Sequence, residues 1–208
     1  MKQIKFSICT ASLFMLMSCV DLNLNPLSEG SSENWYSSQA EIEMSLNDFY
    51  RTDFFPIDDM KWGDDVTARN ETSAVNNGTL TSEDGTIAKR WENYYKGIAR
   101  ALRIINNMDR ARAMGVSERD IAQYEGEAYF YLGYAYGMLA FHWGDAILDK
   151  VGMSLDEAYT ASRSPKADVL AYSYECLDKA AERLPNSYPG IQRATKGAAY
   201  AFKARIAN

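Results

Sequence analysis

The feature that most constrains this chain is a run of sixteen residues, Ala128 to Trp143, that contains no Asp, Glu, Lys or Arg. The run (AYFYLGYAYGMLAFHW) is shorter than the roughly 20 apolar residues that a helix needs to cross a membrane. Its tyrosine hydroxyl and indole N–H groups would also need hydrogen-bond partners that lipid cannot supply. The run therefore predicts a helix buried at the centre of the fold.

Helical spacing continues on both sides of this run, whereas no segment shows the convincing alternation of a β-strand. Apolar residues three and four apart predict helices over about 39–52, from about 87 to a cap at Gly115, from Ser117 to about Phe141, from an N-cap at Ser164 to Pro185, and from Thr195 onward. The spacing of Ser38 and Glu41 predicts a capping box at the start of the first of these helices. Gly133 and Gly137 are expected to let a neighbouring helix approach the buried one. The predicted fold class is all-α, made of tetratricopeptide-like antiparallel helix pairs that are too irregular for the 34-residue consensus.

The first residues are typical of an export signal. Lys2 and Lys5 precede an apolar stretch that ends in Leu16-Met17-Ser18-Cys19, which predicts a signal peptide over residues 1–18. A small residue before a cysteine, with a hydrophobic residue three positions before that cysteine, resembles a lipobox, so we expect lipidation at Cys19. An ordinary signal peptide cut near Ser18 is the alternative. Residues 19–34 are polar and contain Pro, Gly and Ser, which predicts a lipidated tether.

Composition and motifs exclude several classes of function. The net charge of −6 argues against a nucleic-acid binder, which needs a basic surface to neutralise phosphates. One histidine and three cysteines leave little material for a metal site or a catalytic triad, and the common nucleotide, hydrolase and metal motifs are missing from the sequence. His142 is interpreted as a structural hydrogen-bonding residue and Cys176 as a small buried one. We therefore expect no catalytic residue, no metal and no cofactor.

Residues 56–85 form a long segment without a sustained period, and such segments often carry function. Its aromatic, carboxylate, guanidinium and amide groups suit a polyhydroxylated ligand, because aromatic rings stack on sugar rings while polar groups bind hydroxyls. The candidate ligand-binding residues are Trp62, Asp64, Asp65, Arg69 and Asn70. A glycoside hydrolase that uses the acidic pairs of this segment is a weaker hypothesis, because nothing nearby would desolvate one carboxyl group.

Several segments, in order along the chain, resemble the SusD/RagB family of outer-membrane nutrient-binding lipoproteins of Bacteroidetes. They are Cys19–Pro26, Trp35–Tyr50, Trp91–Ala101, Gly126–Tyr134, His142–Asp145, Arg163–Pro165, Leu177–Pro185 and Arg193–Ala199. The fourth is similar to the family's G-E-A-R-F-L-R-A-Y signature, although Tyr129 and Leu132 stand at its two arginine positions.

This resemblance implies a lipid-anchored protein of the outer membrane and the cell surface, which covers a SusC-like, TonB-dependent β-barrel transporter. Such a protein captures a glycan or another nutrient and passes it on without cutting it. Family members are longer, and Asn208 falls within the helix that Thr195 opens, so residues 35–208 are expected to be a SusD-like N-terminal domain truncated at its C-terminus. A helical-repeat adaptor that binds protein instead of sugar is the alternative function.

Overall fold

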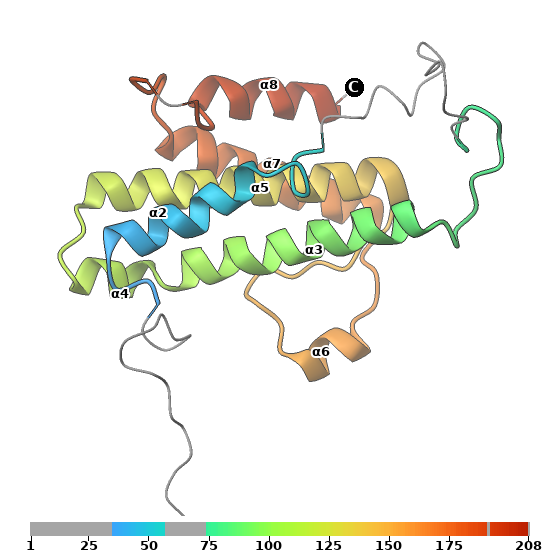
Figure 1. Ribbon diagram of the computed structural model, residues 1–208, viewed down its shortest axis with the longest axis horizontal. Helices are drawn as coiled ribbons and strands as arrows, with labels where there is room; N and C mark the ends of the chain where they lie inside the picture. The colour runs from blue at the N-terminus through green and yellow to red at the C-terminus, as the bar shows by residue number, and fades with distance from the viewer. Residues whose placement is uncertain (1–34, 57–73, 191, 208) are drawn as a thin grey trace, which may run out of the picture. The chain divides into compact units, whose positions relative to one another are not determined.

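The computed structural model describes residues 35–56, 74–190 and 192–207 (Figure 1). In this part of the chain the helices are α2 (Gln39–Asn47), the 3-10 helix η2 (Asp48–Tyr50), α3 (Gly85–Asn106), α4 (Met108–Ala113), α5 (Glu118–Trp143), α6 (Leu155–Thr160), α7 (Lys166–Arg183) and α8 (Lys196–Ala207). The described ranges hold no β-strand beyond an isolated bridge between Ala146 and Ser164, so the all-α prediction is confirmed. The signal peptide of residues 1–18, Cys19 and the tether lie outside the described residues.

Helix α5 lies at the centre of the helical body and contacts α2, α3, α4, α7 and α8 (Figure 1). Every residue from Tyr131 to Ala140 is buried, which leaves no solvent-facing stripe over almost three turns. The prediction of a buried central helix is therefore confirmed.

The glycines of α5 allow two neighbouring helices to come close. A Cβ atom built on Gly133 would lie 2.5 Å from Leu177 Cγ of α7, and one on Gly137 would lie 3.0 Å from Ile206 Cδ1 of α8. Both distances are shorter than side chains tolerate without a shift of the neighbour. The Ser173 hydroxyl also donates to the Gly133 carbonyl at 2.6 Å. The predicted close approach at these glycines is confirmed.

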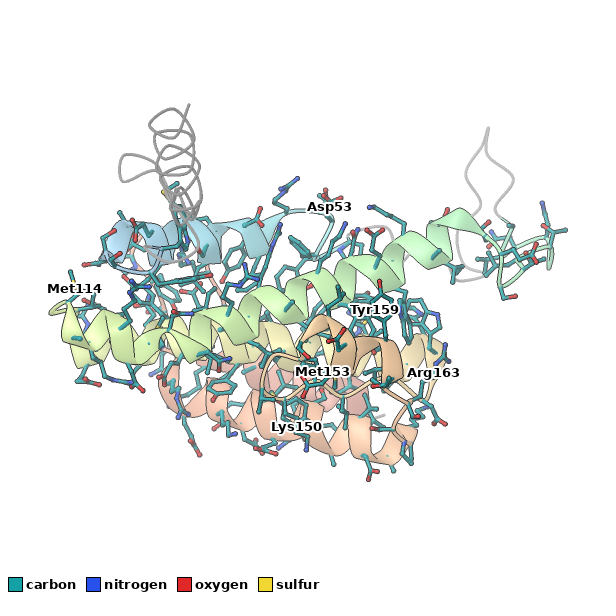
Figure 2. The ribbon with its side chains drawn as sticks, turned by 90° about the horizontal axis from the view of Figure 1, so that it is seen from below. Asp53, Met114, Lys150, Met153, Tyr159 and Arg163 are labelled. Carbon is teal, nitrogen blue, oxygen red and sulfur yellow. The ribbon has the colours of Figure 1, made fainter. Side chains whose placement is uncertain are left out.

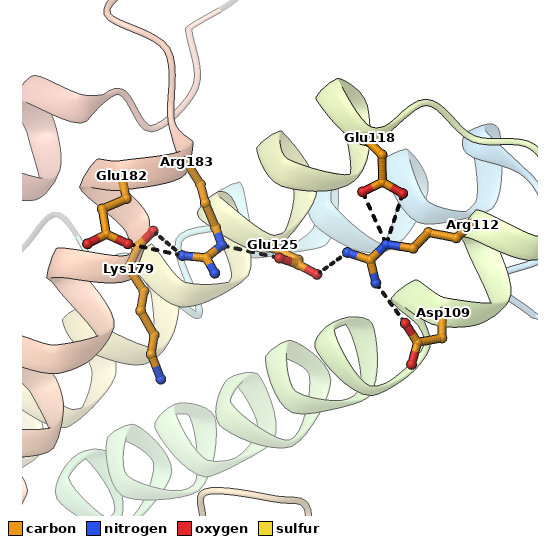
Figure 3. A network of polar contacts seen from close by, with 7 residues as sticks. All are labelled: Asp109, Arg112, Glu118, Glu125, Lys179, Glu182 and Arg183. Carbon is orange, nitrogen blue, oxygen red and sulfur yellow. Dashed lines mark hydrogen bonds and ion pairs between the residues drawn. The ribbon is translucent and has the colours of Figure 1, made fainter.

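An ion-pair network ties α4, α5 and α7 together (Figure 3). Glu125 of α5 binds Arg112 Nη2 at 3.0 Å through one carboxylate oxygen and Arg183 Nε at 3.2 Å through the other. Arg112 also reaches Asp109 and Glu118, at 2.7 and 3.2 Å. Because Glu125 is only 16% exposed, these pairs are less screened by solvent than pairs on an open surface.

Two predicted helices end earlier than the pattern indicates. The capping box of Ser38 and Glu41 opens α2 as predicted, but the α-helix ends at Asn47 and tightens into η2 instead of continuing to residue 52. The helix predicted from about residue 87 to Gly115 is interrupted at Asn107, which separates α3 from α4. The Asn107 side chain donates to the Arg103 carbonyl at 2.7 Å, a local bond that competes with the helical pattern.

The predicted N-cap of α7 is wrong by one residue. Pro165 is the cap and Lys166 begins the helix, because the backbone of Ser164 is already paired with Ala146. Ser164 N donates to the Ala146 carbonyl at 2.8 Å, and the Asp145 carboxylate accepts from Lys166 N at 2.9 Å. Asp145 thus satisfies a helix N-terminal N–H group that a serine cap would have bound.

Helix α6 has no counterpart among the predicted helices, although its capping box of Ser154 and Glu157 is visible in the sequence. Cys176 of α7 is fully buried, as predicted, and burial raises the pKa of its thiol to about 12. None of the helices in the described ranges has the length and hydropathy of a membrane span.

Candidate ligand-binding groove

The residues predicted to bind ligand lie outside the part of the chain that the structure describes. Trp62, Asp64, Asp65, Arg69 and Asn70 all fall between the described residues Pro56 and Ala74. The structure neither brings them together nor separates them, so their role stays a prediction. A different site is formed by described residues.

A groove of about 540 Å³ is lined by η2 and the turn after it, by α5, and by α8 with the segment before it. Its lining residues are Tyr50, Thr52, Phe55, Pro56, Phe130, Tyr134, Met138, Gln192, Arg193, Ala194, Phe202 and Arg205. We call this surface the aromatic groove. Its volume lies within the range of roughly 300–1,000 Å³ that is usual for small-molecule sites.

The aromatic rings of the groove pack against one another in a connected series. The ring centroids of Phe55 and Tyr134 lie 4.6 Å apart, and those of Tyr134 and Phe202 lie 5.0 Å apart. Tyr50 and Phe130 flank Phe55 at 6.0 and 6.2 Å. Contacts at these distances hold aromatic side chains in fixed orientations. The rings therefore form a preformed apolar surface contributed by three separate parts of the chain.

A buried carboxylate, Glu127, holds these parts together. The Tyr50 hydroxyl donates to Glu127 Oε2 at 2.9 Å and accepts from Ala194 N at 2.9 Å. Arg193 Nη1 lies 2.5 Å from the same carboxylate oxygen, and Gln123 Nε2 donates to the other at 3.4 Å. The guanidinium of Arg193 also contacts Asn47 of α2. One carboxylate on α5 thus fixes η2 and the segment that enters α8.

Burial determines the electrostatics of this cluster. The Glu127 side chain is 1% exposed and that of Arg193 12%. Burial raises the pKa of Glu127, while Arg193 and the hydrogen bonds from Tyr50 and Gln123 oppose that shift. Burial and the Glu127 charge raise the pKa of Tyr50, so its hydroxyl stays protonated and can donate. Each charge in the cluster is tolerated because the other is present.

Glu127 stands directly before the charge-free run, inside the segment similar to the family signature, yet its structural role was not predicted. A signal was available in the sequence. A glutamate on the apolar side of a helix must be paired when it is buried, which requires a cation or several hydrogen-bond donors. The identity of those partners depends on contacts over 66 and 77 residues, which spacing along the chain does not reveal.

A second aromatic cluster lies where α3 begins and α5 ends. Trp91 and Trp143 pack edge-to-face at 5.3 Å, and the Arg163 guanidinium covers the Trp91 ring at 4.9 Å. The Tyr95 hydroxyl donates to the Ile147 carbonyl at 3.0 Å, and burial raises its pKa to about 12. Figure 2 shows Arg163 at the end of residues 144–163, the segment around α6 that we call the α6 excursion, with Tyr159 on the same segment. These contacts join the start of α3, the end of α5 and the segment before α7.

The described residues contain no group of His, Cys, Asp and Glu side chains placed to hold a metal ion. They form an all-helical scaffold with an aromatic groove on its surface. A family model described as "Starch-binding associating with outer membrane", of the SusD-like type, matches residues 29–207. The chain belongs to this SusD-like family.

Individual relatives agree with this assignment. SusD-like protein P2 of Formosa agariphila is 24% identical over 93% of this chain and 41% of its own length. The crystal structure of a SusD-like protein from Bacteroides fragilis is 25% identical, with a TM-score of 0.69 over 85% of this chain and 36% of that chain. A solved structure with a xylogluco-oligosaccharide is similar in fold, at 19% identity and a TM-score of 0.65, covering 79% of this chain and 34% of that one. The chain thus spans about a third to two fifths of the length of these relatives.

The Glu127 cluster makes a stability prediction. Arg193→Met removes the counter-charge from a buried carboxylate, so we expect a loss of about 3 kcal/mol in the free energy of unfolding at neutral pH, measured by urea denaturation. Without Arg193 the pKa of Glu127 in the folded state rises further above its unfolded value. The loss should therefore be smaller at about pH 5 than at about pH 8, because a protonated Glu127 needs no counter-charge.

Arg205→Met is the matched control, since Arg205 is an exposed arginine that lines the same groove. It should change the free energy of unfolding by no more than about 0.5 kcal/mol. Equal losses for both variants, or a loss at Arg193 that does not depend on pH, would contradict the role given to the Glu127 charge.

Proposed function

We propose that this protein binds nutrients, chiefly glycans or oligosaccharides, at the outer membrane and delivers them to a partner SusC-like, TonB-dependent transporter. The match of residues 29–207 to the SusD-like family carries the proposal. That family's description names starch binding and association with the outer membrane. One structural relative was solved with a xylogluco-oligosaccharide, which shows that this fold accommodates such a ligand in that protein.

The aromatic groove supports the proposal on physical grounds. Ring faces such as those of Phe55 and Phe202 can stack on the apolar face of a pyranose, and Gln192, Arg205 and Thr52 supply polar groups at the margin. The contacts between the rings reduce the ordering cost of binding, because the surface exists before the ligand arrives.

The lining of the groove favours binding without cleavage. Glycoside hydrolysis ordinarily uses two carboxyl groups on either side of the scissile bond. Among the residues that line the groove in the described ranges there is no Asp or Glu. The carboxylate behind it, Glu127, is buried and engaged by Arg193 and Tyr50. We therefore propose a capture protein that leaves its ligand intact.

A helical-repeat adaptor remains the alternative function, and one observation favours it. The α6 excursion exposes three apolar side chains, with Val151, Leu155 and Tyr159 between 70% and 80% exposed. Side chains of this kind are typical of protein contact surfaces when they gather in one place. The binding experiment below distinguishes the two functions.

The aromatic groove should bind glycan. When the chain is screened on a glycan panel and then studied by calorimetry, it should bind at least one oligosaccharide without releasing new reducing ends. Phe55→Ala should weaken that binding about tenfold, because it removes a stacking surface. Tyr159→Ala, an aromatic truncation at a site 80% exposed on α6, should leave the affinity unchanged. Hydrolysis of the ligand, or equal effects of the two variants, would overturn the proposed site or activity. A β-barrel that co-purifies while every glycan fails would favour the adaptor.

The proposed membrane anchor is Cys19. We propose that Cys19 is lipidated after removal of residues 1–18, which would hold the protein at the outer membrane and at the cell surface. In cells, palmitate labelling and recovery in the membrane fraction should both be lost in Cys19→Ala, whereas Cys176→Ala should retain both. Labelling that persists in Cys19→Ala would reject the lipobox, and an unlabelled wild type cut near Ser18 would indicate an ordinary signal peptide.

A further inference from the structure

Two arginines line the aromatic groove, and the structure gives them different surroundings. Arg193 is neutralised by Glu127 at 2.5 Å and is largely buried. Arg205, on α8, is exposed, and its side chain makes no ion pair or hydrogen bond with any residue in the described ranges. Its helix neighbour Lys203 is paired with Asp178 at 2.5 Å. Arg205 is thus a cation at the groove whose charge no described side chain offsets.

The charge of the lining therefore differs from that of the chain as a whole. The chain carries a net charge of −6, but among the described residues the groove lining has two arginines and no carboxylate. Glu127 behind the lining offsets Arg193, and no side chain in the described ranges offsets Arg205. Charges at such a surface act over roughly 8–10 Å at physiological ionic strength, which is comparable to the size of the groove. Within the described residues, the groove is therefore a local surface that favours anions on a chain whose net charge is negative.

The cost of removing water from the Arg205 guanidinium can distinguish charged from neutral ligands. A ligand that covers the groove removes water from the Arg205 guanidinium, and that costs free energy unless the ligand supplies a hydrogen-bonding partner. A carboxylate or sulfate group matches the planar fork of a guanidinium with two parallel hydrogen bonds. A neutral sugar ring can stack on Phe55 and Phe202 equally well but offers only hydroxyls to the arginine.

We propose that the aromatic groove selects negatively charged saccharides, whose carboxylate or sulfate group pairs with Arg205 while the sugar ring stacks on the groove's aromatic side chains. This inference rests on the proposed glycan-binding function and specifies the class of glycan. It gives Arg205 the role of a specificity determinant, whereas Arg193 positions the groove through Glu127.

The test uses ligands that differ only in charge. Oligogalacturonate, oligomannuronate and a sulfated galactan oligosaccharide are titrated into the full chain beside their neutral counterparts, made by reducing the carboxyl groups or removing the sulfates. At least one charged form should bind about tenfold more tightly than its neutral counterpart, and this preference should shrink as salt is added.

Variants of α8 assign the preference to one residue. Arg205→Met should lose about tenfold in affinity for the charged form and leave the affinity for the neutral form unchanged. The affinity of Arg205→Lys for the charged form should lie between those of the wild type and Arg205→Met, because lysine keeps the positive charge but lacks the planar fork of the guanidinium. Lys203→Met removes one positive charge from the same helix at a side chain already paired with Asp178, and it should keep the wild-type preference.

The outcomes separate this inference from the proposed function. Glycan binding that is the same for charged and neutral forms, or a preference that survives Arg205→Met, would overturn the role of Arg205 and leave glycan binding intact. No binding of any charged or neutral glycan would overturn both. An equal loss of preference in Arg205→Met and Lys203→Met would show that net charge, and not the groove, attracts the ligand.

Discussion

A helix can be buried along most of its length only if most of the polar groups on it find partners on neighbouring elements. Helix α5 meets this condition through contacts with several parts of the described fold, although the buried Tyr131 hydroxyl has no hydrogen-bond partner among the described residues. Glu127 is bound by Tyr50 and Arg193, the Gly133 carbonyl accepts the Ser173 hydroxyl, and the Tyr136 hydroxyl donates to the Asp149 carbonyl at 2.7 Å. These hydrogen bonds and the ion pair hold α7, η2 and the segment that enters α8 against α5.

The same requirement forms the aromatic groove. The partners of Glu127 come from η2 and from the segment before α8, so neutralising this carboxylate also brings Phe55 and Phe202 to the side of α5. The packing of the fold and the shape of the groove are therefore linked through a buried charge. Arg193 is paired with Glu127 and is largely buried. Of the two arginines that line the groove, Arg205 is therefore the one available to bind a ligand in our proposal.

The sequence was sufficient to predict features that depend on local spacing. The burial of α5, the caps at Ser38 and Ser117, and the close approach at Gly133 all follow from residues within one or two helical turns. The break at Asn107 and the shifted start of α7 depend on side-chain and bridge contacts that compete with the helical pattern. The groove joins residues near 50, 130 and 200, so only the tertiary structure could reveal it. The predicted binding residues around Trp62 lie outside the described residues, and their contribution stays a prediction.

Amide hydrogen exchange of the full chain, with and without the tightest-binding oligosaccharide of the titrations, tests most directly whether the groove is the binding surface. Our account predicts slower exchange on binding in the segments 50–56 and 192–205, because the ligand would cover and stabilise both sides of the groove. Exchange within α6 should be unchanged, since it contributes no residue to the groove. Protection confined to residues 144–163, with no change at the groove segments, would contradict the account.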